Sequence, residues 1–126
     1  MHAMQVTIGG LDLELGLNFG AGRELMQKVG DPMGIVREVM LEQAMLQSGL
    51  VHTPKWLPTV ENIPLILWIG AKHGGQKDLK LEAVQDAVFA HGLLESKTVA
   101  LDYVAALTTP TAREKLDAAE GDKAGE

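Results

Sequence analysis

The 126-residue chain has no cysteine, no long apolar run and no cluster of basic residues. Without cysteine there is no disulfide, no thiolate ligand for a metal and no cysteine nucleophile. No apolar stretch approaches the roughly 18 residues of a membrane-spanning helix, and the N-terminus lacks the basic and then apolar order of a signal peptide. We therefore expect a soluble, cytoplasmic protein without a membrane partner.

Positive charge is scarce as well. The chain has 11 Lys and Arg against 17 Asp and Glu, which gives a formal net charge of -6. Because nucleic-acid backbones are negative, they repel such a chain, and we predict no nucleic-acid partner. Hydrophobic residues make up 46% of the sequence, which is enough to fill one core. We expect a single globular domain over residues 1–110.

The N-terminal region has the pattern of a β-hairpin. Val6 and Ile8 alternate with polar residues, and Gly9-Gly10 provides the flexible pair that a tight turn needs. Alternation then resumes with Leu11, Leu13, Leu15 and Leu17. A hairpin is marginally stable alone, so its apolar face must lie on helices. We expect no structural role for residues 1–3.

A helix is predicted from Asn18 to Gly30, because the spacing of apolar residues becomes helical there. Its apolar side consists of Ala21, Leu25, Met26 and Val29.

A long second helix is predicted over residues 33–48. Asp31 caps a helix well, proline is pre-set for a first helical position, and Gly49 is placed to end the helix. Its apolar residues spread around the circumference, which leaves two interpretations. The helix is central in the core, where methionine fills irregular gaps, or it is an adaptable contact surface that includes Met33, Leu41 and Met45. Such a surface also permits a homo-oligomer.

Residues 50–58 contain two prolines and predict a connecting loop. Trp56 and Leu57 in this loop have two interpretations. They form a lid over the core, or they are an interaction hot spot.

Residues 63–73 are ambiguous, because the continuous apolar run at residues 65–69 fits a buried strand as well as a helix. We predict a buried helix that is capped by Asn62, with Pro64 in its first turn and Trp68 inside.

Two further helices complete the predicted fold. One covers residues 81–91, and the other is capped by Ser96 and ends before residues 109–110. Residues 111–126 have little to bury and predict a polar, mobile tail. We therefore expect a mainly α protein of the α+β class, with an N-terminal β-hairpin packed on a bundle of about five helices.

The sequence contains no recognisable catalytic or metal-binding constellation. The four histidines lack metal-ligand spacing, and His73 and His91 suit helix C-terminal turns. The glycines of residues 16–22 lack both the Walker lysine and the GxGxxG spacing. Asp78 and Glu82 have no nucleophile or histidine close by in sequence. We predict no enzymatic activity, no cofactor and no metal.

Three structural motifs connect the predicted elements. Phe19-Gly20-Ala21 leads from the hairpin into a helix, an LW-x-G motif stands at residues 67–70, and an L-x-L-E-x-V-like stretch at residues 79–84 opens a short helix. With these motifs, residues 6–107 resemble the tail assembly chaperones of long-tailed phages and gene transfer agents.

The resemblance implies a non-enzymatic role in virion morphogenesis. Such a chaperone coats the long, helical tape-measure protein in the host cytoplasm, helps recruit tail-tube protein, and is absent from the finished virion. The implied contact is protein–protein, with helix-in-groove packing of apolar and methionine side chains. The candidate partner-binding residues are Met33, Leu41, Met45, Trp56 and Leu57. The alternative is a structural tail subunit, such as a tube or completion protein, that self-assembles. A further alternative is a small-ligand or enzymatic module.

Overall fold

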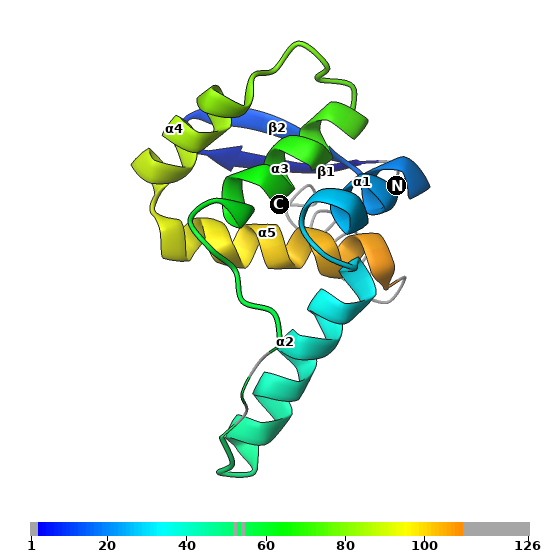
Figure 1. Ribbon diagram of the computed structural model, residues 1–126. Helices are drawn as coiled ribbons and strands as arrows, with labels where there is room; N and C mark the ends of the chain where they lie inside the picture. The colour runs from blue at the N-terminus through cyan, green and yellow to red at the C-terminus, as the bar shows by residue number, and fades with distance from the viewer. Residues whose placement is uncertain (1–2, 52, 54, 110–126) are drawn as a thin grey trace, which may run out of the picture.

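The first elements of the structure are the two strands of the predicted hairpin. The computed structural model describes residues 3–51, 53 and 55–109, where β1 (Ala3–Ile8) pairs antiparallel with β2 (Leu11–Gly16) (Figure 1). The helices that follow are α1 (Phe19–Lys28), α2 (Pro32–Gln47), α3 (Asn62–His73), α4 (Leu81–His91) and α5 (Leu93–Thr108). The predicted α+β fold, a hairpin followed by five helices, is confirmed. The predicted tail at residues 111–126 lies outside the described residues.

Gly9 and Gly10 form the turn between β1 and β2, and both have a positive φ that a side chain would strain. The register pairs Ile8 with Leu11. One face of the ribbon enters the core, through Met4, Ile8, Leu13 and Leu15. The expectation that residues 1–3 have no structural role is wrong for Ala3, which is the first residue of β1.

The helix α3 is the centre of the core, and it contacts β2, α1, α4 and α5. Ile66, Leu67 and Ile69 are fully buried, so the helical interpretation of this apolar run is confirmed. The predicted cap is wrong, because Asn62 is already inside the helix. Its backbone N–H donates to Oγ1 of Thr59 at 3.0 Å, and this bond satisfies one of the free donors at the helix start.

Two glycines let α3 lie very close to its neighbours. A Cβ on Gly74 would collide with the carbonyl oxygen of Glu14, and a Cβ on Gly70 would lie 2.9 Å from the Tyr103 ring. Tyr103 is fully buried on α5, and its hydroxyl donates to the carbonyl oxygen of Gly16 at 2.6 Å. Close packing therefore requires glycine at both Gly70 and Gly74.

The fourth helix spans the predicted residues. The fifth begins at Leu93, and the predicted cap at Ser96 is wrong, because Gly92 (φ 113°) ends α4 and turns the chain directly into α5. Ser96 is buried within α5, and its hydroxyl has no hydrogen-bond partner among the described residues.

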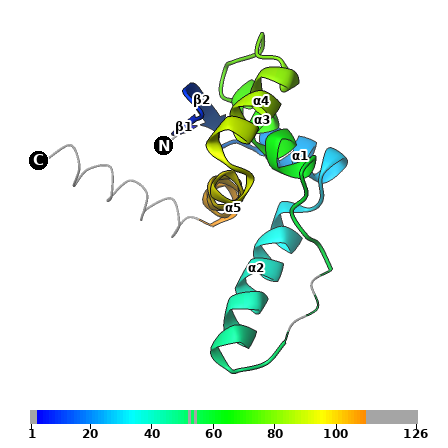
Figure 2. The same cartoon turned by 90° about the vertical axis from the view of Figure 1, so that its left-hand side faces the viewer.

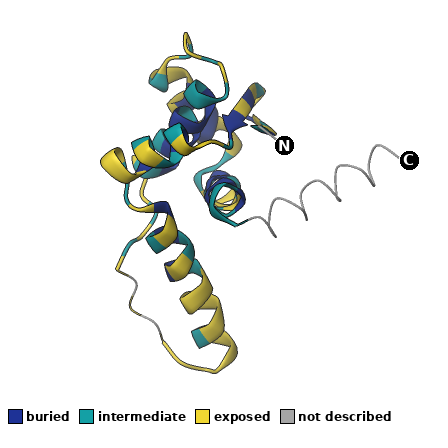
Figure 3. Cartoon of the chain, turned by 90° about the vertical axis from the view of Figure 1, so that its right-hand side faces the viewer, coloured by how far each residue is buried: buried dark blue, intermediate teal, exposed yellow. Residues whose placement is uncertain are grey.

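The second helix projects from the body of the molecule as an arm (Figures 1 and 2). Its start is confirmed, since the Asp31 carboxylate accepts a hydrogen bond from the backbone N–H of Met33 at 3.1 Å. Within the helix, Pro32, Ile35 and Glu38 are the buried residues, and most of the rest is exposed (Figure 3). The interpretation of α2 as a central core helix is therefore wrong.

The connection from α2 back to α3 runs beside the arm (Figure 1). As predicted, its described residues form neither helix nor strand. The backbone N–H of Lys55 donates to the Glu38 carboxylate at 3.1 Å, and Trp56 packs close to Gly30 and Ile35. These contacts hold the base of the arm.

Candidate partner-binding groove

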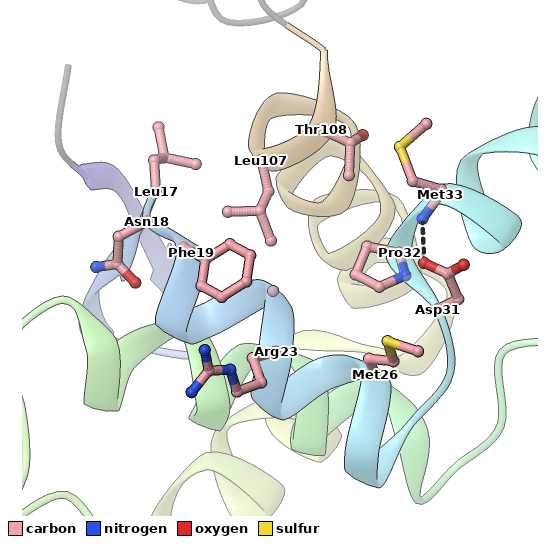
Figure 4. A pocket seen from close by; sticks show the side chains of 11 residues that line it. Leu17, Asn18, Phe19, Arg23, Met26, Asp31, Pro32, Met33, Leu107 and Thr108 are labelled. Atoms are coloured by element: carbon pink, nitrogen blue, oxygen red, sulfur yellow. Dashed lines mark hydrogen bonds between the residues drawn. The ribbon is translucent and has the colours of Figure 1, made fainter.

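An apolar groove lies where α1, the start of α2 and the end of α5 meet (Figure 4). Its volume is about 610 Å³. Figure 4 shows side chains from all three helices around it, including Phe19 from α1, Met33 from α2 and Leu107 from α5. The groove is therefore built from segments that are far apart in the sequence.

A second hollow of about 480 Å³ continues along α2. It shares the lining residues Met33 and Thr108 with the first hollow, so the two hollows adjoin each other. We call both together the methionine groove, and its apolar residues include Phe19, Met26, Met33, Met40, Leu41 and Leu107.

The apolar side chains of this groove are strongly exposed. Phe19 is 77% exposed, and Met26, Met33 and Met40 are each exposed by about two thirds (64%, 65% and 64%). Contiguous apolar patches of this kind mark interaction sites on soluble domains. Methionine is flexible and polarisable, so a methionine surface adapts to partners of different shape. The groove has the character of a protein-binding surface.

The local sequence explains why α1 leaves apolar residues exposed. The Asn18 side chain accepts a hydrogen bond from the Ala21 N–H at 3.0 Å and so fixes the helix start. Within α1, Ala21 and Leu25 are the buried residues. Met26 follows Leu25 by about 100° around the helix, which takes it off the buried stripe and into the groove. The prediction that Met26 lies on the buried side is wrong.

Two arginines stand at the groove. The guanidinium of Arg23 lies 4.9 Å from the centre of the Phe19 ring, a cation–π distance, and Arg37 lines the part along α2. Neither forms a salt bridge with another residue of the described part of the chain. The groove is thus apolar with positive charge beside it, in a chain whose net charge is negative.

The five candidate partner-binding residues do not form one site. Met33 and Leu41 line the groove. Met45 is half-buried, Trp56 packs near Ile35, and Leu57 is 59% exposed in the connecting loop. These three are not among the groove residues.

Sequence reasoning missed Phe19, Arg23, Met40 and Leu107 as groove residues. Met40 and Leu107 have helical apolar spacing, which looks the same for a core stripe and an exposed stripe. Phe19 did carry a signal, since it follows the cap Asn18 directly and precedes Met26 by seven residues, which places both on the same side of the helix.

Trp56 has the geometry of a lid over the core. It packs against the core cluster and lines a hollow of about 200 Å³ with Gly34, Ile35 and Glu38. Its Nε1 atom is buried and has no hydrogen-bond partner within the described residues.

A charged cluster holds α1 against α3. The carboxylate of Glu24 accepts hydrogen bonds from Lys28 Nζ (2.7 Å), Lys72 Nζ (2.6 Å) and His73 Nε2 (2.8 Å). Burial raises the pKa of Glu24, but the three hydrogen bonds and the charge of Lys72 outweigh it and lower this pKa to about 2. The Lys72 ammonium also lies 4.0 Å from the centre of the Trp68 ring. The cluster fixes the position of α1, which carries one wall of the groove.

The other polar features have structural partners. His73 lies in the last turn of α3, as predicted, and Nδ1 of His91 accepts a hydrogen bond from the Gly9 N–H at 3.3 Å. His2 and His52 lie outside the described residues. In the described part of the chain, no three or more histidine, aspartate or glutamate side chains gather as metal ligands do. None of the described helices combines the length and the apolar character needed to span a bilayer.

No protein-family model, curated protein or solved structure matches this chain. The resemblance to tail assembly chaperones therefore stays a prediction from the sequence motifs.

Proposed function

We propose that the chain is a non-enzymatic tail assembly chaperone that binds a tape-measure protein and helps recruit tail-tube subunits. The observation that carries the proposal is the methionine groove, an exposed apolar surface built by α1, α2 and α5. The sequence motifs of residues 19–21, 67–70 and 79–84 support the same function.

The groove accepts the apolar face of a partner helix. Its apolar side chains extend from Phe19 past Met33 to Met40, and the i, i+3, i+4 and i+7 positions of an amphipathic helix provide matching anchors. Flexible methionines let the same groove bind many different segments of one long helical protein. A chaperone that coats a tape-measure protein needs this tolerance.

The arginines at the groove give it a preference among the helices that it can bind. Arg23 and Arg37 lie at the groove and form no salt bridge with another described residue. Acidic residues that flank the apolar face of a partner helix pair with them, and such pairs influence association rate and specificity more than affinity. The chaperone therefore favours tape-measure segments whose apolar face has acidic neighbours.

The size of the methionine groove is consistent with release of the partner. A groove that holds one helix buries less area than a permanent interface does, so the contact is reversible. A reversible contact in the host cytoplasm is consistent with a chaperone that leaves before the virion is complete.

The test is affinity capture of the tagged chain from cells that express its native neighbouring genes. Mass spectrometry then identifies the captured proteins. We expect recovery of a long helical tape-measure protein with the wild type. Met40→Lys places a charge in the groove and should reduce this recovery at least about tenfold, which corresponds to roughly 1.4 kcal/mol.

The matched control is Leu46→Lys on the same helix. Leu46 is 67% exposed and is not one of the groove residues, so this variant should capture as well as the wild type. Recovery of the chain alone, with the tape-measure protein present in the lysate, contradicts the proposal. Isolation of the chain from finished particles favours the alternative of a structural tail subunit.

A further inference from the structure

The two edges of the hairpin differ. The outer edge of β2 is covered by side chains: Gln76 Nε2 donates to the Asp12 carbonyl oxygen at 3.1 Å, and Gln76 Oε1 accepts from the Glu14 N–H at 2.7 Å. The Tyr103 hydroxyl donates to the Gly16 carbonyl oxygen. Gln76 and Tyr103 thus take the place of a third strand.

Within the described part of the chain, no side chain forms such hydrogen bonds along the outer edge of β1. Along each strand of an antiparallel pair, residues alternate: one directs its N–H and C=O groups at the partner strand, and the next directs them away from it. Two residues that lie directly opposite each other always have the same orientation. The hydrogen bonds to Gln76 and Tyr103 show that the main-chain groups of β2 point outward at Asp12, Glu14 and Gly16. The main-chain groups of β1 therefore point outward at the opposite residues, Thr7, Gln5 and Ala3. Among the residues that the structure describes, none bonds to the outward main-chain groups of β1.

The composition of β1 leaves this edge open to pairing. Exposed edge strands are usually protected by charged side chains, prolines or bulges. The strand AMQVTI contains no charge and no proline, whereas the neighbouring β2 carries Asp12 and Glu14. The side chains of Gln5 and Thr7 are exposed, and the hairpin lies at the outside of the molecule (Figures 2 and 3).

We propose that β1 is a dimerisation strand, through which two copies of this chain form one four-stranded antiparallel sheet about a two-fold axis. The register that joins the outward groups places Gln5 opposite Gln5 and Ala3 opposite Thr7. This register sets no two charges against each other, although each chain carries a net charge of -6. A second copy is therefore the partner that β1 fits, and the surface is self-complementary, as a two-fold interface requires.

The decisive variant is Gln5→Pro. Proline removes the outward N–H and places its ring toward the incoming strand, and edge strands accept it when that N–H does not bond within the ladder. At the two-fold axis the change removes both reciprocal hydrogen bonds. We expect dimerisation to weaken by about 100-fold, because two hydrogen bonds are lost and the proline rings clash with the incoming strand. Gln5→Thr keeps the N–H and is the matched control.

Sedimentation equilibrium over a range of concentrations measures the outcome. The wild type and Gln5→Thr should show a mass of twice 13.5 kDa, and Gln5→Pro a mass of 13.5 kDa under the same conditions. Hydrogen exchange checks the fold. In Gln5→Pro, the Thr7 amide should exchange quickly while the Val6 amide, which bonds to β2, stays protected. A wild-type monomer at every concentration overturns the proposal, and so does a dimer that Gln5→Pro leaves intact.

Discussion

Glu24 shows how one residue couples distant parts of this fold. It lies on α1, and two of its three hydrogen-bond donors, Lys72 and His73, come from the end of α3. Its side chain is 15% exposed, so solvent screens these contacts less than it screens a surface pair. The network holds α1, and with it Phe19 and Met26, at the groove.

Glu24→Gln should destabilise the protein by about 1 to 2 kcal/mol at neutral pH, because it leaves the lysines without their carboxylate. Urea unfolding measures this change. The pKa of Glu24 is about 2 in the folded protein against an ordinary value of 4.5, so its stabilisation is fully present above pH 4.5 and is lost as the pH falls toward 2. The difference between wild type and variant should shrink over that range. An equal difference at all pH values would show that the lost stability does not come from the carboxylate charge.

Tyr103 is the single tyrosine of the chain, so its ionisation can be followed directly. Burial raises its pKa well above the ordinary value of 10.0. The hydroxyl of Tyr103 loses its proton more readily in the unfolded protein than in the folded one, so stability should fall as the pH rises above 10.0. In an alkaline titration, the ultraviolet absorbance of tyrosinate should appear together with unfolding. Tyrosinate that forms at about pH 10 in a protein with native circular dichroism would contradict the buried hydrogen bond to Gly16.

Local residue roles could be predicted from the sequence, and distant ones could not. The Asp31 cap at the start of α2 and the turn at Gly9-Gly10 follow from rules that span a few residues. The contacts of Glu24 with Lys72 and of Tyr103 with Gly16 join residues 48 and 87 positions apart. No local pattern records such pairs.

At the scale of elements, α2 shows that the signals for forming a helix differ from the signals for burying it. Its cap, proline and end signals predict a helix correctly, but its apolar residues do not reveal that the helix leaves the core. The position of the helix depends on α5 and on the returning loop with Trp56, which pack at its base. For this reason the groove between α1, α2 and α5 could not be predicted, although two of its residues, Met33 and Leu41, were.

Two glycine substitutions test this difference between elements. Gly34 lies in α2, where an added Cβ meets its nearest atom at 3.9 Å, so Gly34→Ala should stabilise the protein by about 0.5 to 1 kcal/mol through helix propensity. Gly74→Ala should destabilise it by more than about 2 kcal/mol, because the methyl group collides with the Glu14 carbonyl. Thermal unfolding of both variants shows whether each substitution stabilises or destabilises the protein. Equal effects of the two substitutions would contradict the close packing of α3 on β2.

At the scale of the whole molecule, the chain offers two kinds of surface. The methionine groove is apolar with arginines beside it, and it suits a helix. The edge of β1 is uncharged main chain and suits a strand. If both are used, a dimer through β1 carries two grooves, and linked sites bind a long helical partner more tightly than either does alone.

The most direct test of the central claim is a nuclear magnetic resonance titration with methyl-labelled methionine. The probe is a purified helical segment of a phage tape-measure protein, the proposed partner. Binding in the groove should shift the methyl signals of Met26, Met33 and Met40, while Met4, which is 7% exposed in the core, stays unchanged. A titration that binds the segment but leaves these three signals in place would contradict the groove as the partner-binding site, and no binding at all would contradict the proposed chaperone function.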